Sequence, residues 1–155
     1  HYLEEVIVSL RPTLKHSAIS VDIVSAEKIE MDSYPGAISQ ILTNFVTNAL
    51  MHAFDPGQEG KIAIIASRNA DLVRLVVHDN GRGIAPENLA RIFDPFFTTQ
   101  RSKGGSGLGL HIVYNLVSQT LGGTIRVEST PSEGTSFIMN IPCIAPEASA
   151  PAESV

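Results

Sequence analysis

The hexapeptide DNGRGI at residues 79–84 follows an alternation of apolar side chains over residues 73–77, which predicts a β-strand ending at Asp79. Gly81 and Gly83 would allow a flat ligand to approach the backbone beside that carboxylate. An ionised Asp only accepts hydrogen bonds, so it would favour the amino group of adenine over the oxygen that guanine carries there. A simple turn is the alternative, because Asn-Gly is itself a strong turn signal.

Helix and strand patterns surround this hexapeptide. Apolar residues recur at helical spacing over residues 2–15, 37–54, 86–93 and 108–121. Strand patterns occupy residues 19–23, 29–31, 62–64, 73–79, 125–127 and 137–141. This order predicts one α+β domain over residues 1–142, a sandwich with helices against one face of a sheet. Residues 143–155 are rich in Ala, Pro, Glu and Ser, and we expect them to form a disordered tail.

Composition excludes several classes of protein. The formal net charge of -5 and the lack of a basic stripe argue against a sequence-independent nucleic-acid binder. The single cysteine, Cys143, cannot form an internal disulfide, and no Cys/His spacing resembles a zinc site. This cysteine usage fits a reducing compartment, and we expect a cytoplasmic domain. No apolar run is long enough to span a membrane.

Asn44 and Asn48 lie four residues apart on the predicted helix over residues 37–54, so both amides project from one face. An amide oxygen suits Mg²⁺, which takes one or two protein ligands and completes its shell with water and phosphate oxygens. The alternative is that both side chains are exposed or cap neighbouring backbone.

A glycine-rich stretch, GGSGLGL at residues 104–110, opens directly onto the next predicted helix. Its backbone N–H groups and the helix N-terminus would form an anion site suited to phosphates. It is not a P-loop, because no Gly-Lys-Ser/Thr follows, and its spacing differs from the dinucleotide fingerprint. A flexible linker would have the same composition. The aromatic residues at 93, 96 and 97 precede this stretch, and ordinary packing is the default explanation for them.

In this order, the segments resemble the catalytic ATP-binding domain of sensor histidine kinases, in the superfamily that includes gyrase, Hsp90 and MutL. The resemblance covers residues 2–142. Residues 44–49 look like the N box, residues 79–83 and 105–110 like the two glycine boxes, and residues 93–97 like the F box. Residues 133–137 are similar to the closing strand. The resemblance implies a Bergerat-type fold, with a mixed sheet packed against helices, and ATP and Mg²⁺ as cofactors.

The resemblance also implies roles for individual residues. Asn48 would bind Mg²⁺, Asp79 would read the adenine amino group, and Thr135 would contribute to the adenine pocket, usually through water. Met51 stands where the family often has a basic residue, and His52 either replaces that phosphate contact or is a surface histidine. The implied nucleotide-binding residues are Asn44, Asn48, His52, Asp79, Gly81, Gly83, Ile84, Phe93, Gly105, Ser106, Gly107, Leu108, Gly109, Leu110 and Thr135.

Asn44 and Asn48 are the expected catalytic residues. Hydrolysing relatives commonly carry Glu at the position of Asn44, and an amide cannot act as that base, which favours phosphoryl transfer over hydrolysis. The alternatives are an ATPase of the gyrase or Hsp90 type, a serine kinase of the anti-sigma-factor type, and a nucleotide-binding pseudokinase.

The phosphoacceptor histidine of this kinase class is typically followed by an acidic residue. Only His78 has such a neighbour, and that neighbour is the Asp79 expected to bind adenine. The implied partners are therefore dimerisation helices carrying the acceptor outside these residues and, indirectly, a response regulator. We expect a monomeric catalytic fragment whose parent kinase can be anchored in the inner membrane.

Overall fold

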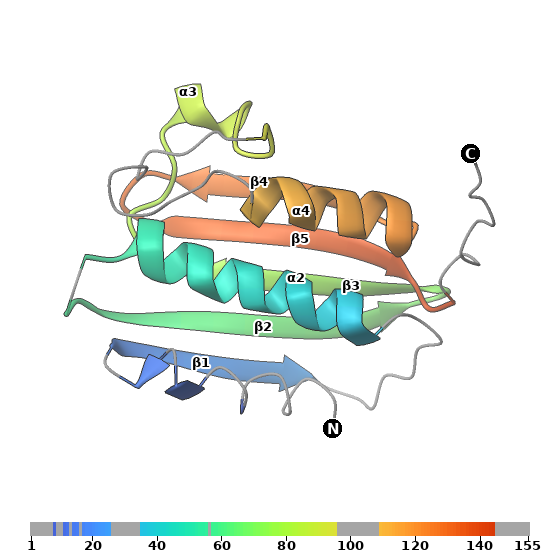
Figure 1. Ribbon diagram of the computed structural model, residues 1–155, viewed down its shortest axis with the longest axis horizontal. Coiled ribbons are helices and arrows are strands. Elements are labelled where there is room, and N and C mark those ends of the chain that lie inside the picture. Colours follow the sequence, from blue (N-terminus) through green and yellow to red (C-terminus); the bar gives the residue numbers. More distant parts are fainter. Residues whose placement is uncertain are drawn as a thin grey trace.

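The computed structural model describes residues 8, 11, 12, 14, 15, 17–25, 35–55, 57–95 and 109–144. Within these residues lies one sheet of five strands in the order β1-β2-β3-β5-β4 (Figure 1). The strands are β1 (Ala18–Ser25), β2 (Glu59–Asn69), β3 (Leu72–Asp79), β4 (Thr124–Thr130) and β5 (Gly134–Pro142). β1 pairs with β2 in parallel and every other pairing is antiparallel, so the sheet is mixed.

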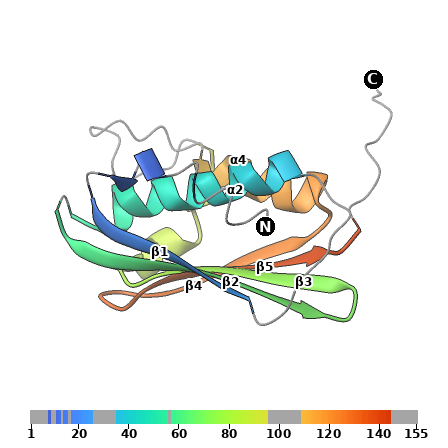
Figure 2. The same cartoon turned by 90° about the horizontal axis from the view of Figure 1, so that it is seen from below.

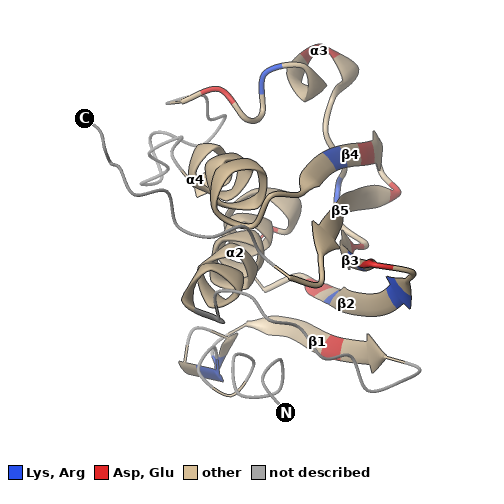
Figure 3. Cartoon of the chain, turned by 90° about the vertical axis from the view of Figure 1, so that its right-hand side faces the viewer, with Lys and Arg blue, Asp and Glu red and all other residues tan. Residues whose placement is uncertain are grey.

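Helices cover one face of this sheet. They are α2 (Pro35–Asn48), continued by the π-helical turn η1 (Ala49–Ala53), and α4 (Gly109–Asn115), continued by the π-helical turn η3 (Leu116–Thr120). The short helix α3 (Pro86–Leu89) lies beyond the β4 edge of the sheet (Figure 1). Figure 2 shows α2 and α4 side by side on the same side of the sheet. Neither carries a Lys, Arg, Asp or Glu residue, as the uniform tan of both helices in Figure 3 makes visible. The predicted two-layer α+β sandwich is confirmed.

The core lies between these two layers. Ile41, Leu42, Phe45 and Val46 follow helical spacing along α2 and are almost completely buried. The Phe45 ring packs on that of Phe137 in β5, with ring centroids 4.6 Å apart. Burial of each such side chain stabilises the fold by roughly 1.5–3 kcal/mol. The helix layer is thus fixed to the centre of the sheet.

The element boundaries differ from the predicted ones in places. The short predicted helix over residues 86–93 ends earlier, at Leu89, and turns occupy residues 90–93. Most of the predicted helix over residues 2–15 and the predicted strand over residues 29–31 lie outside the described residues. None of the helices in the described ranges is both long and apolar enough to cross a membrane.

The first residue of the predicted tail, Cys143, packs against the sheet. Cys143 is buried, and its N–H donates to the carbonyl oxygen of Asp71 over 2.9 Å, at the β2–β3 turn. The thiol behaves as a small apolar group, and its backbone extends the pairing at the end of β5. The packed part of the chain therefore reaches beyond residue 142, and residues 145–155 lie outside the described residues.

Candidate functional site

A cavity of about 360 Å³ opens where β3 ends beneath the last turn of α2. It has the size of a small-molecule site. Its lining comes from α2 and η1, the end of β3, the segment that leads through α3, the start of α4, and β5. The lining residues are Asn48, His52, Ala53, Asp79, Arg82, Gly83, Ile84, Ala85, Asn88, Ile92, Leu110, Thr135 and Phe137.

Asp79 is a buried carboxylate within this lining, with 6% of its surface exposed. Its Oδ1 accepts a hydrogen bond from the N–H of Gly81 over 2.9 Å. Burial raises the pKa of Asp79 above its usual value, against the smaller lowering effects of the Gly81 bond, the charge of His78 and the Thr135 backbone. Among the described residues, none forms an ion pair with it. This buried acceptor is suited to a donor group of a ligand, such as an amino group.

The backbone after Asp79 is held by the turn between β4 and β5. Gly83 has φ of +77°, and a Cβ there would overlap the carbonyl oxygen of Thr130, so only glycine fits. The N–H of Ser132 donates to the carbonyl oxygen of Arg82 over 2.7 Å. The N–H of Ile84 donates to the Ser129 hydroxyl over 2.8 Å. The loop that follows Asp79 is thus fastened to a hairpin far away in sequence.

Asn48 and His52 enter the cavity from the end of α2 and from η1. Asn48 supplies an amide oxygen, an atom type that Mg²⁺ accepts, and a bound polyphosphate would supply the remaining oxygens. The pKa of His52 is lowered, chiefly by burial and secondly by the nearby charge of Arg82. The neutral imidazole is therefore favoured, so His52 would contact a ligand through hydrogen bonds and not through a positive charge.

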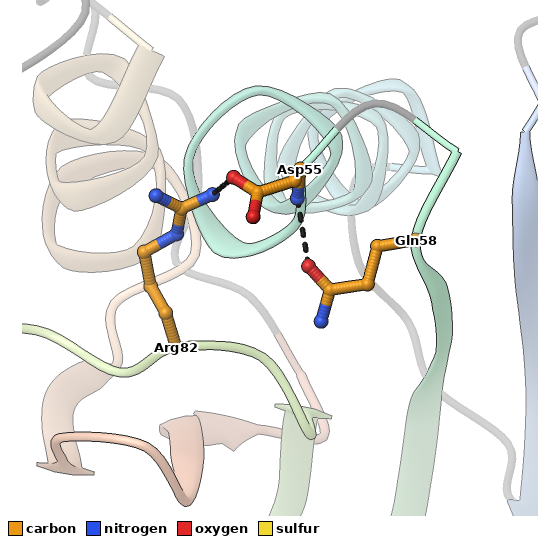
Figure 4. A network of polar contacts seen from close by, with 3 residues as sticks. All are labelled: Asp55, Gln58 and Arg82. Carbon is orange, nitrogen blue, oxygen red and sulfur yellow. Dashed lines mark hydrogen bonds and ion pairs between the residues drawn. The ribbon is translucent and has the colours of Figure 1, made fainter.

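Arg82 lies at the rim of the cavity and pairs with Asp55 at 2.6 Å, as Figure 4 shows. The backbone N–H of Asp55 donates to the side chain of Gln58 over 2.8 Å, and the N–H of Arg82 donates to the carbonyl oxygen of Ala53 over 2.9 Å. The Arg82 side chain is half exposed, and these contacts tie it to the segment after η1. Because both charged groups are substantially exposed, the pair adds little stability.

Seven of the predicted nucleotide-binding residues line the cavity together, namely Asn48, His52, Asp79, Gly83, Ile84, Leu110 and Thr135. Asn44 is not in the lining, and its Nδ2 is 3.5 Å from the carbonyl oxygen of Gly109 at the start of α4. Gly81 supports Asp79 through its N–H. Phe93 packs its ring against Tyr114 and Phe137, with centroids 5.4 and 6.3 Å away.

Gly105, Ser106, Gly107 and Leu108 lie outside the described residues. Several lining residues were not predicted, including Ala53, Ala85, Asn88, Ile92 and Phe137. Ile92 and Phe137 are apolar, and a sequence does not distinguish apolar residues that line a cavity from those that fill the core. Phe137 is the last residue of the segment similar to the closing strand, residues 133–137, which is the one signal that could have identified it.

The chain matches the family of histidine kinase-, DNA gyrase B- and HSP90-like ATPases over residues 34–144. Sensor histidine kinase ZraS of Escherichia coli (strain K12) is 40% identical over 113 residues, which are 73% of this chain and 23% of ZraS. The chain therefore spans about a quarter of the length of this relative.

Solved structures agree with this match. The nucleotide-free catalytic domain of histidine kinase ThkA superposes with a TM-score of 0.78 at 31% identity, covering 92% of each chain. Full-length ShkA in complex with AMPPNP gives a TM-score of 0.78 at 30% identity, covering 95% of this chain and 30% of ShkA. ThkA in complex with the response regulator protein TrrA gives 0.71 at 30% identity, covering 91% of this chain and 39% of the ThkA chain.

The matched segment contains every residue that lines the cavity. The chain thus belongs to the family of histidine kinase-, DNA gyrase B- and HSP90-like ATPases, as a catalytic ATP-binding domain of the sensor histidine kinase type.

Proposed function

We propose that the domain binds Mg-ATP in the cavity beside Asp79 and donates the γ-phosphate to a histidine on dimerisation helices outside residues 1–155. The observation that carries this proposal is the buried Asp79 carboxylate, which lines the cavity, can accept further hydrogen bonds and forms no ion pair among the described residues. Burying such a charge costs stability, so a ligand that donates a hydrogen bond to it provides a reason for its place there.

The two ends of the cavity suit the two ends of ATP. The adenine amino group would donate to Asp79, against the apolar surfaces of Ile84 and Phe137. Asn48 enters the cavity from α2, and its amide oxygen would hold Mg²⁺. We expect the glycine-rich residues 105–109, which lie outside the described residues, to contact the phosphates through backbone N–H groups.

Phosphoryl transfer requires chiefly that these residues position ATP and that the charge on its phosphates is neutralised. In the transfer, a ring nitrogen of the acceptor histidine forms a bond to the γ-phosphorus, and the bond from that phosphorus to the bridging oxygen breaks to release ADP. Bound Mg²⁺ would neutralise charge on the phosphates. Asn44 carries an amide that cannot deprotonate water, and its contact with Gly109 suits a role in holding α4 against α2.

The similarity to ZraS and ThkA favours a histidine acceptor over hydrolysis or a serine acceptor. The solved complex of ThkA with TrrA supports a response regulator as the next partner, reached through the phosphorylated helices. We propose that the domain is monomeric by itself, works in the cytoplasm and depends on its parent chain for any anchoring in the membrane. Met51 stands where the family often has a basic residue, so a nucleotide-binding pseudokinase is the competing function.

The decisive experiment is radiolabelled transfer from Mg-ATP to the parent kinase's dimerisation helices, supplied in trans. We expect label on the helices, with the acid lability of phosphohistidine, and none on the domain alone. Asn48→Ala should abolish the transfer, whereas Asn69→Ala, an exposed residue at the end of β2, should leave it unchanged. Acid-stable label on serine, or transfer that survives Asn48→Ala, would overturn the proposal.

A further inference from the structure

Three polar side chains form one row across the sheet at the edge of the cavity. Asp79 in β3 is directly opposite Thr135 in β5, and Thr135 is directly opposite Ser129 in β4. Side chains of directly paired residues project from the same face of a sheet, next to each other. Asp79 and Thr135 both line the cavity and both are buried. Ser129 is half-buried behind Thr135 and does not line the cavity.

The Ser129 hydroxyl has three close partners. It accepts a hydrogen bond from the N–H of Ile84 over 2.8 Å, and it donates to the carbonyl oxygen of Gly134 over 3.0 Å. Its third contact, over 2.9 Å, is with the hydroxyl of Thr135. A hydroxyl has one hydrogen and two lone pairs, so three partners exhaust its capacity.

These partners determine which hydroxyl donates to the other. The carbonyl oxygen of Gly134 can only accept, so it takes the one Ser129 hydrogen. The hydrogen between Ser129 and Thr135 must then belong to Thr135. Because Thr135 has only that hydrogen to give, the side of its oxygen that meets the cavity offers lone pairs alone.

We infer that Ser129 is a positioning residue that fixes the direction of the Thr135 hydroxyl, so that Asp79 and Thr135 together present only acceptors to the purine. An adenine amino group carries two hydrogens and can satisfy both acceptors, directly or through water. A 6-oxo purine would place another acceptor there and leave buried groups unpaired. This inference rests on the proposed binding of ATP, and it extends that function to the discrimination between 6-amino and 6-oxo purines.

The test compares the affinities of ATP and ITP, which carries oxygen in place of the 6-amino group, by calorimetry. Wild-type protein should prefer ATP. Ser129→Ala frees the Thr135 hydroxyl to turn its hydrogen toward the cavity, and the ratio of the two affinities should fall by about 3- to 10-fold. Ser129→Thr keeps a hydroxyl at the same place on a strand and should restore the ratio.

The loss of the Ile84 contact in Ser129→Ala would weaken both nucleotides alike, so the affinity ratio separates loop damage from the inferred role. Thr135→Val keeps the bonds of Ser129 to Ile84 and Gly134 and should lower the ratio by itself. Ser129→Ala added to Thr135→Val should change the ratio no further, because Ser129 acts through the hydroxyl already removed.

An unchanged ratio in folded Ser129→Ala, or in folded Thr135→Val, would overturn the inference. So would an equal effect of Ser129→Ala in both backgrounds. Failure of the proposed function would give a different result. Wild-type protein would then bind ATP weakly, and Asp79→Asn would not change that affinity. A clear loss of ATP affinity in Asp79→Asn combined with an unchanged ratio in Ser129→Ala would refute the role of Ser129 alone.

Discussion

Replacement of Asp79 by Asn tests the adenine site with the smallest possible change of shape. The carboxylate already accepts from the Gly81 N–H, and it must accept from the adenine amino group at the same time. An amide has one acceptor oxygen in place of two, so it can keep only one of these bonds when the two donors meet different oxygens of the carboxylate. In either orientation of the amide, its NH₂ group faces another donor, from the loop or from the ligand.

The size of the effect follows from the burial of Asp79. A hydrogen bond to a charged, buried group contributes about 1.5–3 kcal/mol, which corresponds to a loss of ATP affinity of roughly 10- to 150-fold. ITP carries an acceptor in place of the amino group, so it should lose much less affinity or gain some. Asp79→Asn should therefore reduce the preference for ATP over ITP as well as the affinity for ATP.

Calorimetric titration of both nucleotides into wild-type protein and Asp79→Asn provides the measurement. Glu128→Gln is a matched control, because it removes one negative charge from an exposed ion pair with Arg126 outside the cavity lining. It should leave both affinities nearly unchanged. Equal ATP affinities for wild-type protein and Asp79→Asn, or an equal loss for ATP and ITP, would refute the proposed contact.

Three further predictions concern stability and pH. The raised pKa of Asp79 means that the folded state holds the proton more tightly than the unfolded state, so stability falls as pH rises from about 3.8 through the folded-state pKa. Asp79→Asn should therefore have a higher free energy of unfolding than wild-type protein at pH 7, measured by urea denaturation, and this difference should vanish at pH 3. Equal free energies of unfolding at pH 7 would contradict the cost of burying the Asp79 charge. Phe45→Ala removes a ring packed on Phe137 and should lower the free energy of unfolding by about 3–5 kcal/mol, measured by urea denaturation. Asp55→Asn breaks the exposed pair with Arg82 and should lower it by no more than about 1 kcal/mol; a larger loss would show that this pair stabilises the cavity rim.

Much of the site could be predicted because local patterns mark it. Asp79 ends an alternating strand beside two glycines, and Asn48 belongs to a helix whose apolar spacing defines its buried face. These features depend on neighbours within a few residues. Residues 105–108 were predicted from glycines that directly precede a helix and from the resemblance to a glycine box, and they remain a prediction.

Other features depend on contacts that a single sequence does not reveal. Ser129 holds the backbone of Ile84 from 45 residues away, and no local pattern distinguishes it from other serines on exposed strands. Asn44 finds its partner in Gly109, 65 residues along the chain. Ile92 and Phe137 join the cavity wall only because the fold leaves space beside them. The strand order, with β5 between β3 and β4, is set by such long-range pairing.

That insertion of β5 has a consequence for synthesis on the ribosome. β5 is the last strand in chain order among the described residues, yet it occupies an inner position of the sheet and supplies Thr135 and Phe137 to the cavity. A nascent chain that has not yet extended past β5 therefore lacks one wall of its nucleotide site. ATP at cellular concentrations would stabilise only chains that have completed the sheet, by an amount that grows with the logarithm of its concentration over Kd. The nucleotide would act on the newly made domain as a selective ligand for completed folding before it serves as a phosphate donor.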